Sequence, residues 1–353
     1  IINGAMQVAQ RGTSFASVTA SAYHLDRFQY NLNGTVGAAT VTQNTVTDLA
    51  GFTKSLKVDC TTADASLAAS DRLTLRYAFE GQDLQQVAKG TSSAKQLTLS
   101  FYIKATKTGT QIVELFDHDN TRHCAKSVTI SQSNTWEKKT ITYPADTTGA
   151  LDNDNANSIS IFFGIACGTD FTSGTLATAW AANTNANRFV GQVNHFDNTA
   201  NNFEITGVQL EVGSVATDFE HRSINSELQL CKRYFNNFGA TTATGTSATY
   251  MLIQGGYAKF GGASSIALQR IFYDVEMRAT PTITYGRNST NDDNNVMRWS
   301  DLGSNPVVLL GSTEGSNKSG FQITRYNSNA GQTYNEGDAF THQVSKFTAN
   351  AEL

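Results

Sequence analysis

The sequence predicts an all-β protein: an N-terminal jelly-roll β-sandwich, a short linking helix and a smaller C-terminal β-sandwich. Many short runs alternate apolar and polar residues, which is the pattern of half-buried strands. Clusters of Asn, Asp, Ser, Thr and Gly separate these runs and favour turns. Only 3 residues are proline and 16% are charged, while 353 residues with 39% hydrophobic content suffice for two ordinary cores.

The first predicted domain, residues 1–221, is a jelly roll. Strands are expected where every second residue is apolar, because one side of each strand then faces the core. Polar connectors such as residues 107–109 and 152–155 separate the runs, and many short antiparallel strands with such turns are typical of a jelly roll. The clearest alternating positions are Leu97, Leu99, Phe101 and Ile103, then Ile159, Ile161, Phe163 and Ile165, then Val208, Leu210 and Val212.

The linking segment, residues 222–238, breaks the β pattern. Apolar residues recur there every three or four positions, which places them on one face of a helix. Ser223 directly precedes this pattern and suits the N-cap position. We expect one helix whose apolar face is buried. The residues of that face are Ile224, Leu228, Cys231 and Phe235.

The second predicted domain, residues 239–353, is a smaller β-sandwich. Tracts rich in Asn, Asp, Ser and Gly at 288–295 and 311–320 separate its strand-like runs. These runs lie at residues 250–253, 266–268, 281–285, 307–310 and 321–323.

The charge balance disfavours nucleic acid as a partner. The net charge is −4 and the isoelectric point is about 5.9, so the chain offers no basic field to a phosphate backbone. No apolar run approaches the roughly 20 residues that cross a bilayer, and the start lacks the charged and apolar regions of a secretory signal. We therefore expect neither nucleic-acid binding nor membrane insertion.

Cysteine usage indicates a reducing compartment. The four cysteines stand singly, with no Cys-x-x-Cys pair and no His at ligand spacing. They predict reduced, buried thiols, although an even count leaves long-range disulfides open as an alternative. These residues are Cys60, Cys124, Cys167 and Cys231.

The familiar catalytic motifs are missing from the sequence. It contains no Gly-x-Ser-x-Gly elbow, phosphate-binding loop, dinucleotide fingerprint or His-Glu-x-x-His, and no His stands in a recognisable triad context. A pair of carboxylates for glycoside hydrolysis is defined by its separation in space, which a sequence does not give. We expect no enzymatic role, with a glycan depolymerase as the alternative.

Three sets of stretches resemble phage-encoded proteins. They are NGAMQVAQRG (3–12) with YHLDRF (23–28), TGVQLEVG (206–213) with ATDFEHR (216–222) and CKRYF (231–235), and MRATPTI (277–283) with FTANAEL (347–353). The first set resembles the opening of tail-fibre-like and virion structural proteins, often from marine phages. The second resembles the signature that closes their carbohydrate-binding-module-like jelly roll, and the third resembles their C-terminal sandwich.

This resemblance implies a structural and adhesive subunit of a phage particle. Such a tail fibre or fibre-like appendage would bind a host-surface glycan through its jelly roll and so serve host attachment. The resemblance also implies assembly in the host bacterial cytoplasm and location in the virion. Its implied partners are other virion proteins and copies of the chain itself, with a trimer as the first expectation. A capsid-decorating or connector protein without receptor binding is the alternative.

The second stretch also suggests a local clamp. Glu211 and Glu220 flank a turn that contains Gly213, and Arg222 follows directly. We expect a carboxylate-guanidinium contact that pins the last strand to the helix entry, with a structural role.

No cofactor is expected, except for one structural calcium ion that the jelly-roll resemblance allows. Asp152 and Asp154 alternate in an oxygen-rich run and can reach one ion. A hydrophilic loop explains the same residues and is the alternative. A second oxygen-rich run, residues 117–123, fails the calcium-loop pattern because Arg122 stands where the sharp turn needs Gly. We interpret that run as a hairpin loop.

Sugar binding needs an aromatic platform bordered by planar amide or acid groups. Trp180 lies in a polar segment and Trp299 follows an Asn- and Asp-rich loop, so both are expected to be exposed. They are the candidate glycan-binding residues, with a packing anchor or a subunit contact as the alternative for each. Trp136 begins an alternating strand and is expected in the core.

Overall fold

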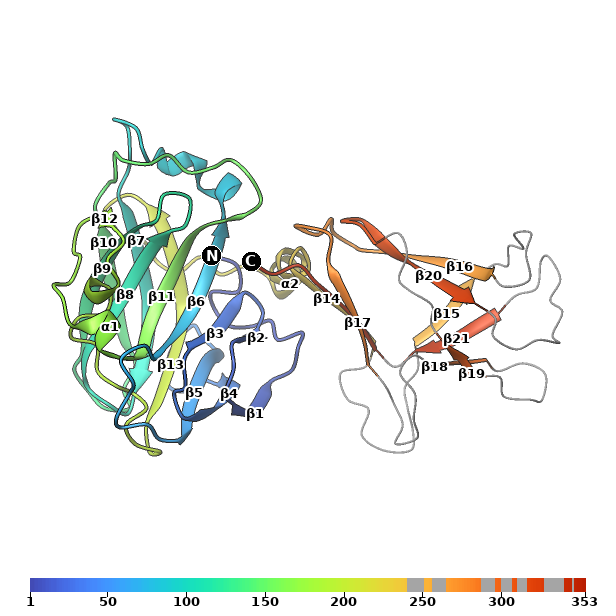
Figure 1. Ribbon diagram of the computed structural model, residues 1–353, viewed down its shortest axis with the longest axis horizontal. Coiled ribbons are helices and arrows are strands. Elements are labelled where there is room, and N and C mark those ends of the chain that lie inside the picture. The colour runs from blue at the N-terminus through green and yellow to red at the C-terminus, as the bar shows by residue number, and fades with distance from the viewer. Residues whose placement is uncertain are drawn as a thin grey trace. The chain divides into compact units, whose positions relative to one another are not determined.

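The computed structural model, drawn in Figure 1, describes residues 1–239, 251–255, 265–286, 296–299, 307–309, 316–326, 340–344 and 346–353. It divides into two compact units, residues 1–228 with Leu353 and residues 229–352. The predicted boundaries after residues 221 and 238 differ from this division. Antiparallel strands dominate both units, so the predicted all-β fold class is confirmed.

The first unit is a sandwich of two antiparallel sheets, which we call sheets A and B (Figure 1). The six strands of sheet A are, in order, β1 (Ser14–Val18), β4 (Ala38–Thr45), β5 (Lys54–Thr62), β13 (Asn202–Val212), β7 (Leu97–Ala105) and β10 (Glu137–Tyr143). The seven strands of sheet B are, in order, β12 (Ala181–Ala182), β9 (Arg122–Ile130), β8 (Gly109–Asp117), β11 (Asn157–Cys167), β6 (Arg72–Glu80), β3 (Phe28–Asn33) and β2 (Ala22–Leu25).

The order of the strands is that of a jelly roll. From β5 to β13, each successive long strand enters the opposite sheet, except at the β8–β9 hairpin. The strands of this series are adjacent in each sheet: β5, β13, β7 and β10 in sheet A, where β10 is the edge strand, and β6, β11, β8 and β9 in sheet B. This exchange of eight successive strands between the two sheets is the arrangement of the jelly roll that the sequence predicts.

The core of the first unit lies between the two sheets. In β7, Leu99, Phe101 and Ile103 are fully buried, whereas Tyr102 and Lys104 between them are only half-buried on the outer side of sheet A. This period of two is the alternation that predicts the strand. Each fully buried side chain of this kind stabilises the fold by about 1.5–3 kcal/mol.

A long segment, residues 168–196, covers part of the outer side of sheet B. It contains α1 (Thr169–Thr172) and η2 (Asn185–Asn187), and its Phe171 and Phe189 pack with Ile112 of β8 and Phe162 of β11. Arg188 in the same segment pairs with the buried Glu114 of β8 at 2.6 Å. This segment, the covering segment, carries Trp180.

The second unit consists of three antiparallel sheets within its described residues. The three-stranded sheet contains β14 (Phe235–Gly239), β22 (Lys346–Asn350) and β17 (Thr282–Gly286). The four-stranded sheet contains β15 (Met251–Gly255), β21 (Phe340–Val344), β18 (Val296–Trp299) and β19 (Val307–Leu309). The remaining pair is β16 (Ser265–Phe272) with β20 (Gly320–Tyr326).

The linking helix forms but is shorter than predicted. Helix α2 spans Ile224–Lys232, and Ser223 caps it as predicted, because its Oγ accepts a hydrogen bond from the backbone N–H of Ser226 at 3.2 Å. The chain turns after the helix and enters β14 at Phe235, where pairing with β22 replaces helical hydrogen bonds. The prediction of helix up to residue 238 is therefore wrong.

The predicted buried stripe is correct only near the end of this segment. Cys231 is fully buried and Phe235 is 5% exposed, although Phe235 belongs to a strand. Leu228 is half-buried, and Ile224 is 50% exposed. Ile224 lies in the first helical turn, where residues 222–226 are all exposed.

All four cysteines are buried, as predicted, and are free thiols. Burial raises the pKa of Cys60 to about 11 and that of Cys124 to about 12, so both are protonated at neutral pH. Within the described residues, no helix has the length and apolar character that crossing a membrane requires.

Candidate functional site

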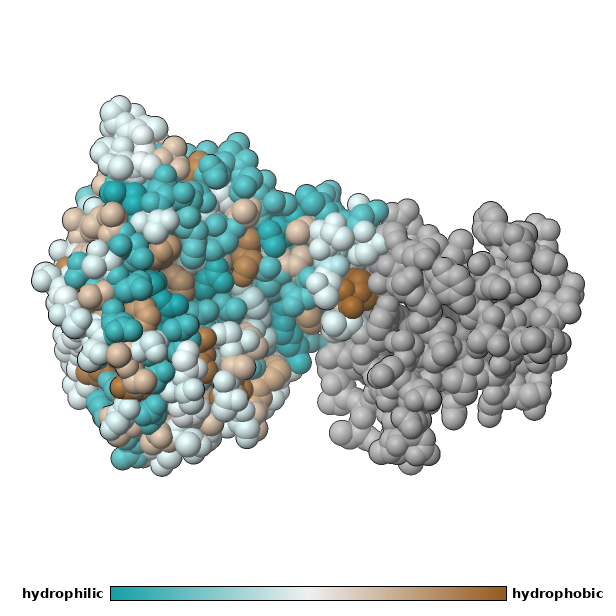
Figure 2. All heavy atoms as spheres, in the orientation of Figure 1, coloured by the Kyte–Doolittle hydropathy of each residue, from teal (hydrophilic) through white to brown (hydrophobic). Residues whose placement is uncertain are grey.

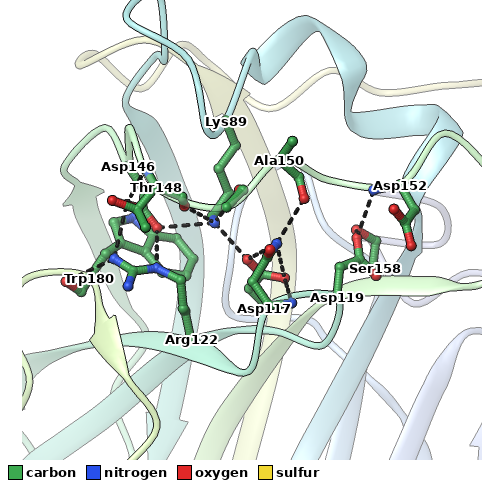
Figure 3. A network of polar contacts seen from close by, with 12 residues as sticks. Lys89, Asp117, Asp119, Arg122, Asp146, Thr148, Ala150, Asp152, Ser158 and Trp180 are labelled. Atoms are coloured by element: carbon green, nitrogen blue, oxygen red, sulfur yellow. Dashed lines mark hydrogen bonds and ion pairs between the residues drawn. The ribbon is translucent and has the colours of Figure 1, made fainter.

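Two predicted site residues, Trp180 and Asp152, belong to one polar network at an end of the first unit (Figure 3). Three segments meet there: the loop after η1 (Gly81–Val87), the turn between β8 and β9, and the loop that joins β10 to β11. The β8–β9 turn lies in the predicted hairpin loop at residues 117–123, so that prediction is confirmed.

The ammonium of Lys89 lies at the centre of this network. Its Nζ is 2.6 Å from Oδ2 of Asp117 and 3.0 Å from Oδ2 of Asp146. It also donates to the backbone carbonyls of Thr148 and Gly149, each at 2.9 Å. The Lys89 side chain is only 2% exposed. We call these four acceptors the oxygen cage; Figure 3 shows Lys89 reaching into it between Asp117 and Asp146.

Arg122 completes the charge balance of the network. Its Nε and Nη2 donate to the two carboxylate oxygens of Asp146 at 2.9 and 3.0 Å, in a bidentate arrangement. Burial alone would raise the pKa of Asp146, but the hydrogen bonds from Arg122 and Lys89 outweigh it and hold the pKa below its usual value. The Asp146 carboxylate is therefore ionised at neutral pH.

The contacts of Trp180 favour a packing anchor, the alternative to a sugar platform. Its indole packs against the main core, and its Nε1 donates to the carbonyl of Pro144 at 2.9 Å. Lys89 Nζ lies 5.1 Å from the centre of the ring, within cation–π range. The indole is half-buried, so the expectation of an exposed Trp180 is wrong.

Asp152 and Asp154 hold their own loop together. The backbone N–H of Asp152 donates to Oδ2 of Asp119 at 3.0 Å, and Oδ1 of Asp154 accepts from the N–H of Ala156 at 2.9 Å. Within the described residues, no group of three or more His, Cys, Asp or Glu side chains could hold a metal ion. These contacts favour the hydrophilic-loop alternative over the calcium site.

Trp136 lies on the surface, although the sequence analysis expected it in the core. Its half-buried indole precedes β10, and Nε1 donates to Oδ1 of Asp48 at 2.9 Å. Lys104 Nζ donates to Oδ2 of the same carboxylate at 2.7 Å and lies 5.6 Å from the indole centre. The hydrogen bond from Lys104 lowers the pKa of Asp48, so its carboxylate is charged beside the ring.

Neighbouring outer residues of sheet A extend this surface. The strand register pairs Tyr102 of β7 with Lys138 of β10, and both share the outer side with Lys104. Tyr102 packs against Phe52 with ring centroids 5.2 Å apart. An indole, a phenol, two ammonium groups and a carboxylate thus line the outer side of sheet A near β10.

The sequence contains a signal for the position of Trp136. Ile141 and Tyr143 of β10 are buried, so the odd-numbered positions of this strand face the core. Trp136 has an even number and therefore belongs to the outer side. Trp299 is the last residue of β18, and its side chain lies outside the described part of the structure.

The predicted clamp at residues 211–222 has different partners. Glu211 accepts hydrogen bonds from the backbone N–H and the hydroxyl of Thr217, at 3.0 and 2.6 Å. Arg222 pairs with Glu227 of α2 at 3.5 Å, and not with Glu220. The contact still joins this segment to the helix, but the prediction of its residues is wrong.

No protein-family model matches the chain, and no curated protein matches it. Several solved structures are similar in fold. A putative sugar binding protein from Bacteroides thetaiotaomicron is 14% identical, with 60% of this chain and 98% of that chain covered and a TM-score of 0.33. A family 11 carbohydrate-binding module of a Clostridium thermocellum cellulase is 15% identical, with 57% and 99% covered and a TM-score of 0.26. The enzymatically active domain of bacteriophage CBA120 tailspike protein 4 is 13% identical over 60% of this chain, with a TM-score of 0.30, and the match spans 21% of that chain.

Proposed function

We propose that this chain is a glycan-binding, adhesive subunit of a phage particle, and that Trp136 forms the centre of its sugar platform. The observation that carries the proposal is the half-buried indole on the outer side of sheet A, held by Asp48 and flanked by Lys104. Sugars stack their C–H faces on aromatic rings, while charged and amide groups beside the ring bind their hydroxyls.

The surroundings of Trp136 support this role. Hydrogen bonding through Nε1 fixes the orientation of the indole, so little side-chain entropy is lost when a ligand stacks on it. The Asp48 side chain is 53% exposed, which leaves its carboxylate accessible to sugar hydroxyls. Figure 2 shows one face of the first unit, which is mainly hydrophilic with scattered hydrophobic residues.

The phage context rests on the sequence resemblance to tail-fibre-like proteins. In that context the chain would belong to the virion, after assembly in the bacterial cytoplasm, and would contact other virion proteins. Identical copies around one axis would turn weak sugar contacts into useful avidity. We extend the proposal to a trimer on this ground.

We further propose that the subunit has no enzymatic activity. Three buried carboxylates of sheet B and its adjoining loops, Glu114, Asp117 and Asp146, are bound by cationic side chains. Such carboxylates are held by structural contacts and are poorly placed to exchange protons with a substrate. Release of reducing ends from a bound polysaccharide would instead favour the depolymerase alternative.

Glycan-array binding of the wild type and of Trp136→Ala tests the proposal. We expect the wild type to bind at least one bacterial surface glycan, and the variant to lose affinity by at least about tenfold, because the stacking platform is gone. Lys57→Ala is the matched control: it is another outer residue of sheet A, paired only with Asp59 at 2.7 Å. Equal binding by wild type and Trp136→Ala would reject the platform, and immunolabelling that never marks intact phage particles would reject the virion role.

A further inference from the structure

The oxygen cage around Lys89 has the composition of a hard-cation site. Two carboxylates and two backbone carbonyls converge on one point, and calcium takes the same classes of ligand. The three N–H bonds of the ammonium are shared among these four oxygens. A single, nearly buried positive charge thus stands where a metal ion would otherwise be needed.

The surrounding chain is built to aim these oxygens inward. Gly149 has φ of +74°, which glycine adopts readily, and a Cβ at this position would lie 2.5 Å from the side chain of Asn120. Asn120 donates from Nδ2 to Oδ2 of Asp117 at 3.0 Å and to the carbonyl of Ala150 at 2.8 Å. The cage therefore has its own supporting hydrogen bonds, independent of Lys89.

We propose that Lys89 supplies the resident cation of this cage, and that the cage becomes a divalent-cation site when Lys89 is replaced by a small neutral residue. The calcium ion that the jelly-roll resemblance allows has little support at Asp152 and Asp154: Oδ1 of Asp154 already accepts from the N–H of Ala156, and in the described part of the chain neither residue belongs to a group of three or more metal-ligating side chains. In the wild type, the positive charge inside the cage is the Lys89 ammonium and not a metal ion. The inference is independent of the proposed glycan binding.

The charges and distances in the cage agree with replacement of the Lys89 ammonium by a divalent cation. Lys89 and Arg122 balance the two carboxylates, so loss of Lys89 leaves one buried negative charge uncompensated. The distance from Nζ to Asp117 Oδ2, 2.6 Å, lies at the upper end of the roughly 2.3–2.6 Å of calcium ligands. The other three, 2.9, 2.9 and 3.0 Å, are longer, so the cage has to contract on these sides to bind the ion. Water molecules in the volume left by the lysine side chain would complete the coordination.

Thermal unfolding of Lys89→Ala, purified and measured with calcium or with a chelator, tests this inference. In chelator we expect the melting temperature to fall by about 10 °C, because buried negative charge is left unpaired. Calcium at about 10 mM should restore most of this loss, since a site with few protein ligands binds weakly. The wild type should respond to calcium much less.

Terbium luminescence locates the ion. Tb³⁺ prefers the same oxygen ligands as calcium and emits when a nearby indole is excited, and Trp180 lies next to the position of Nζ. We expect Trp180-sensitised emission from Lys89→Ala and none from the wild type. A second change, Asp117→Asn, should abolish both the emission and the thermal response to calcium.

Lys104→Ala is the matched control, because Lys104 also lies over a tryptophan and pairs with an aspartate, but contacts only that one carboxylate. It should gain neither a calcium response nor emission. The inference is overturned if calcium leaves the melting of Lys89→Ala unchanged, if that variant does not fold even in calcium, or if the wild type responds equally.

Discussion

At the residue scale, burial and neighbouring charges set the protonation state of single side chains, as they do for His195. His195 is 1% exposed, and its Nε2 lies 3.3 Å from Oε1 of Gln111. Burial, assisted by the charge of Lys107, lowers the pKa of His195 to about 3, so the imidazole is neutral in the folded state. In the unfolded chain it binds a proton below about pH 6.5.

This difference predicts acid sensitivity. The unfolded state binds the extra proton, so the free energy of unfolding falls as pH drops from about 6.5 towards 3. At pH 5 the loss due to His195 is about 2 kcal/mol. Urea unfolding of wild type and His195→Gln at pH 7 and pH 5 measures it. Between pH 7 and pH 5, the free energy of unfolding of His195→Gln should fall by about 2 kcal/mol less than that of the wild type. The control variant, His221→Gln, changes an exposed histidine and should behave as wild type. An equal fall for wild type and His195→Gln would contradict the assignment.

At the scale of elements, a buried ion pair joins the covering segment to sheet B, beside the apolar packing of Phe171 and Phe189 and the pairing of β12 with β9. Glu114 of β8 is fully buried and accepts hydrogen bonds from Arg188 at 2.6 and 2.8 Å and from His123 at 2.9 Å. Burial alone would raise the pKa of Glu114, but Arg188 and His123 outweigh it and lower the pKa. The carboxylate is therefore charged and depends on its partners.

Arg188→Ala should release the covering segment. It leaves Glu114 buried without its strongest partner, which costs about 3–5 kcal/mol. We expect lower stability in urea and new protease cleavage within residues 168–196. Lys57→Ala removes a partly exposed ion pair and should cost less than about 1 kcal/mol. Unchanged proteolysis of Arg188→Ala would show that apolar packing alone holds the segment.

At the scale of the molecule, the exposed apolar residues bear on assembly. Ile224 and Leu230 of α2 and Phe272 of β16 are 50%, 39% and 65% exposed. Charged residues are only 16% of the chain, so little charge opposes contact between copies. These features agree with the proposed oligomer.

The mass of the purified protein in solution tests the proposed trimer. Light scattering at micromolar concentration should give about three times the 38.1 kDa of one chain. Replacing Phe272 by Ser should lower the measured mass if this residue lies between copies. A wild-type protein that stays monomeric at that concentration would refute the proposed trimer.

The sequence by itself determined the all-β class, the jelly-roll strands, the cap at Ser223 and the buried cysteines. Each of these follows from local information: a period of two, a capping residue next to a helical stripe, or the apolar character of a thiol. The alternation along β10 also predicts that Trp136, an even-numbered residue, faces away from the core. The end of α2 does not follow from local sequence, because β14, which begins after the helix, pairs with β22 more than a hundred residues away.

Only the tertiary structure decided which polar residues meet. Asp117, Asp146 and the carbonyls of Thr148 and Gly149 come from two separate loops, and the lysine that binds them comes from a third. Trp180 is an anchor because the fold lays it against the core and over Lys89. A local pattern records which face of a strand a residue occupies. It does not record which loops the jelly roll brings together at its end, and those loops decide whether a cation comes from solvent or from the chain.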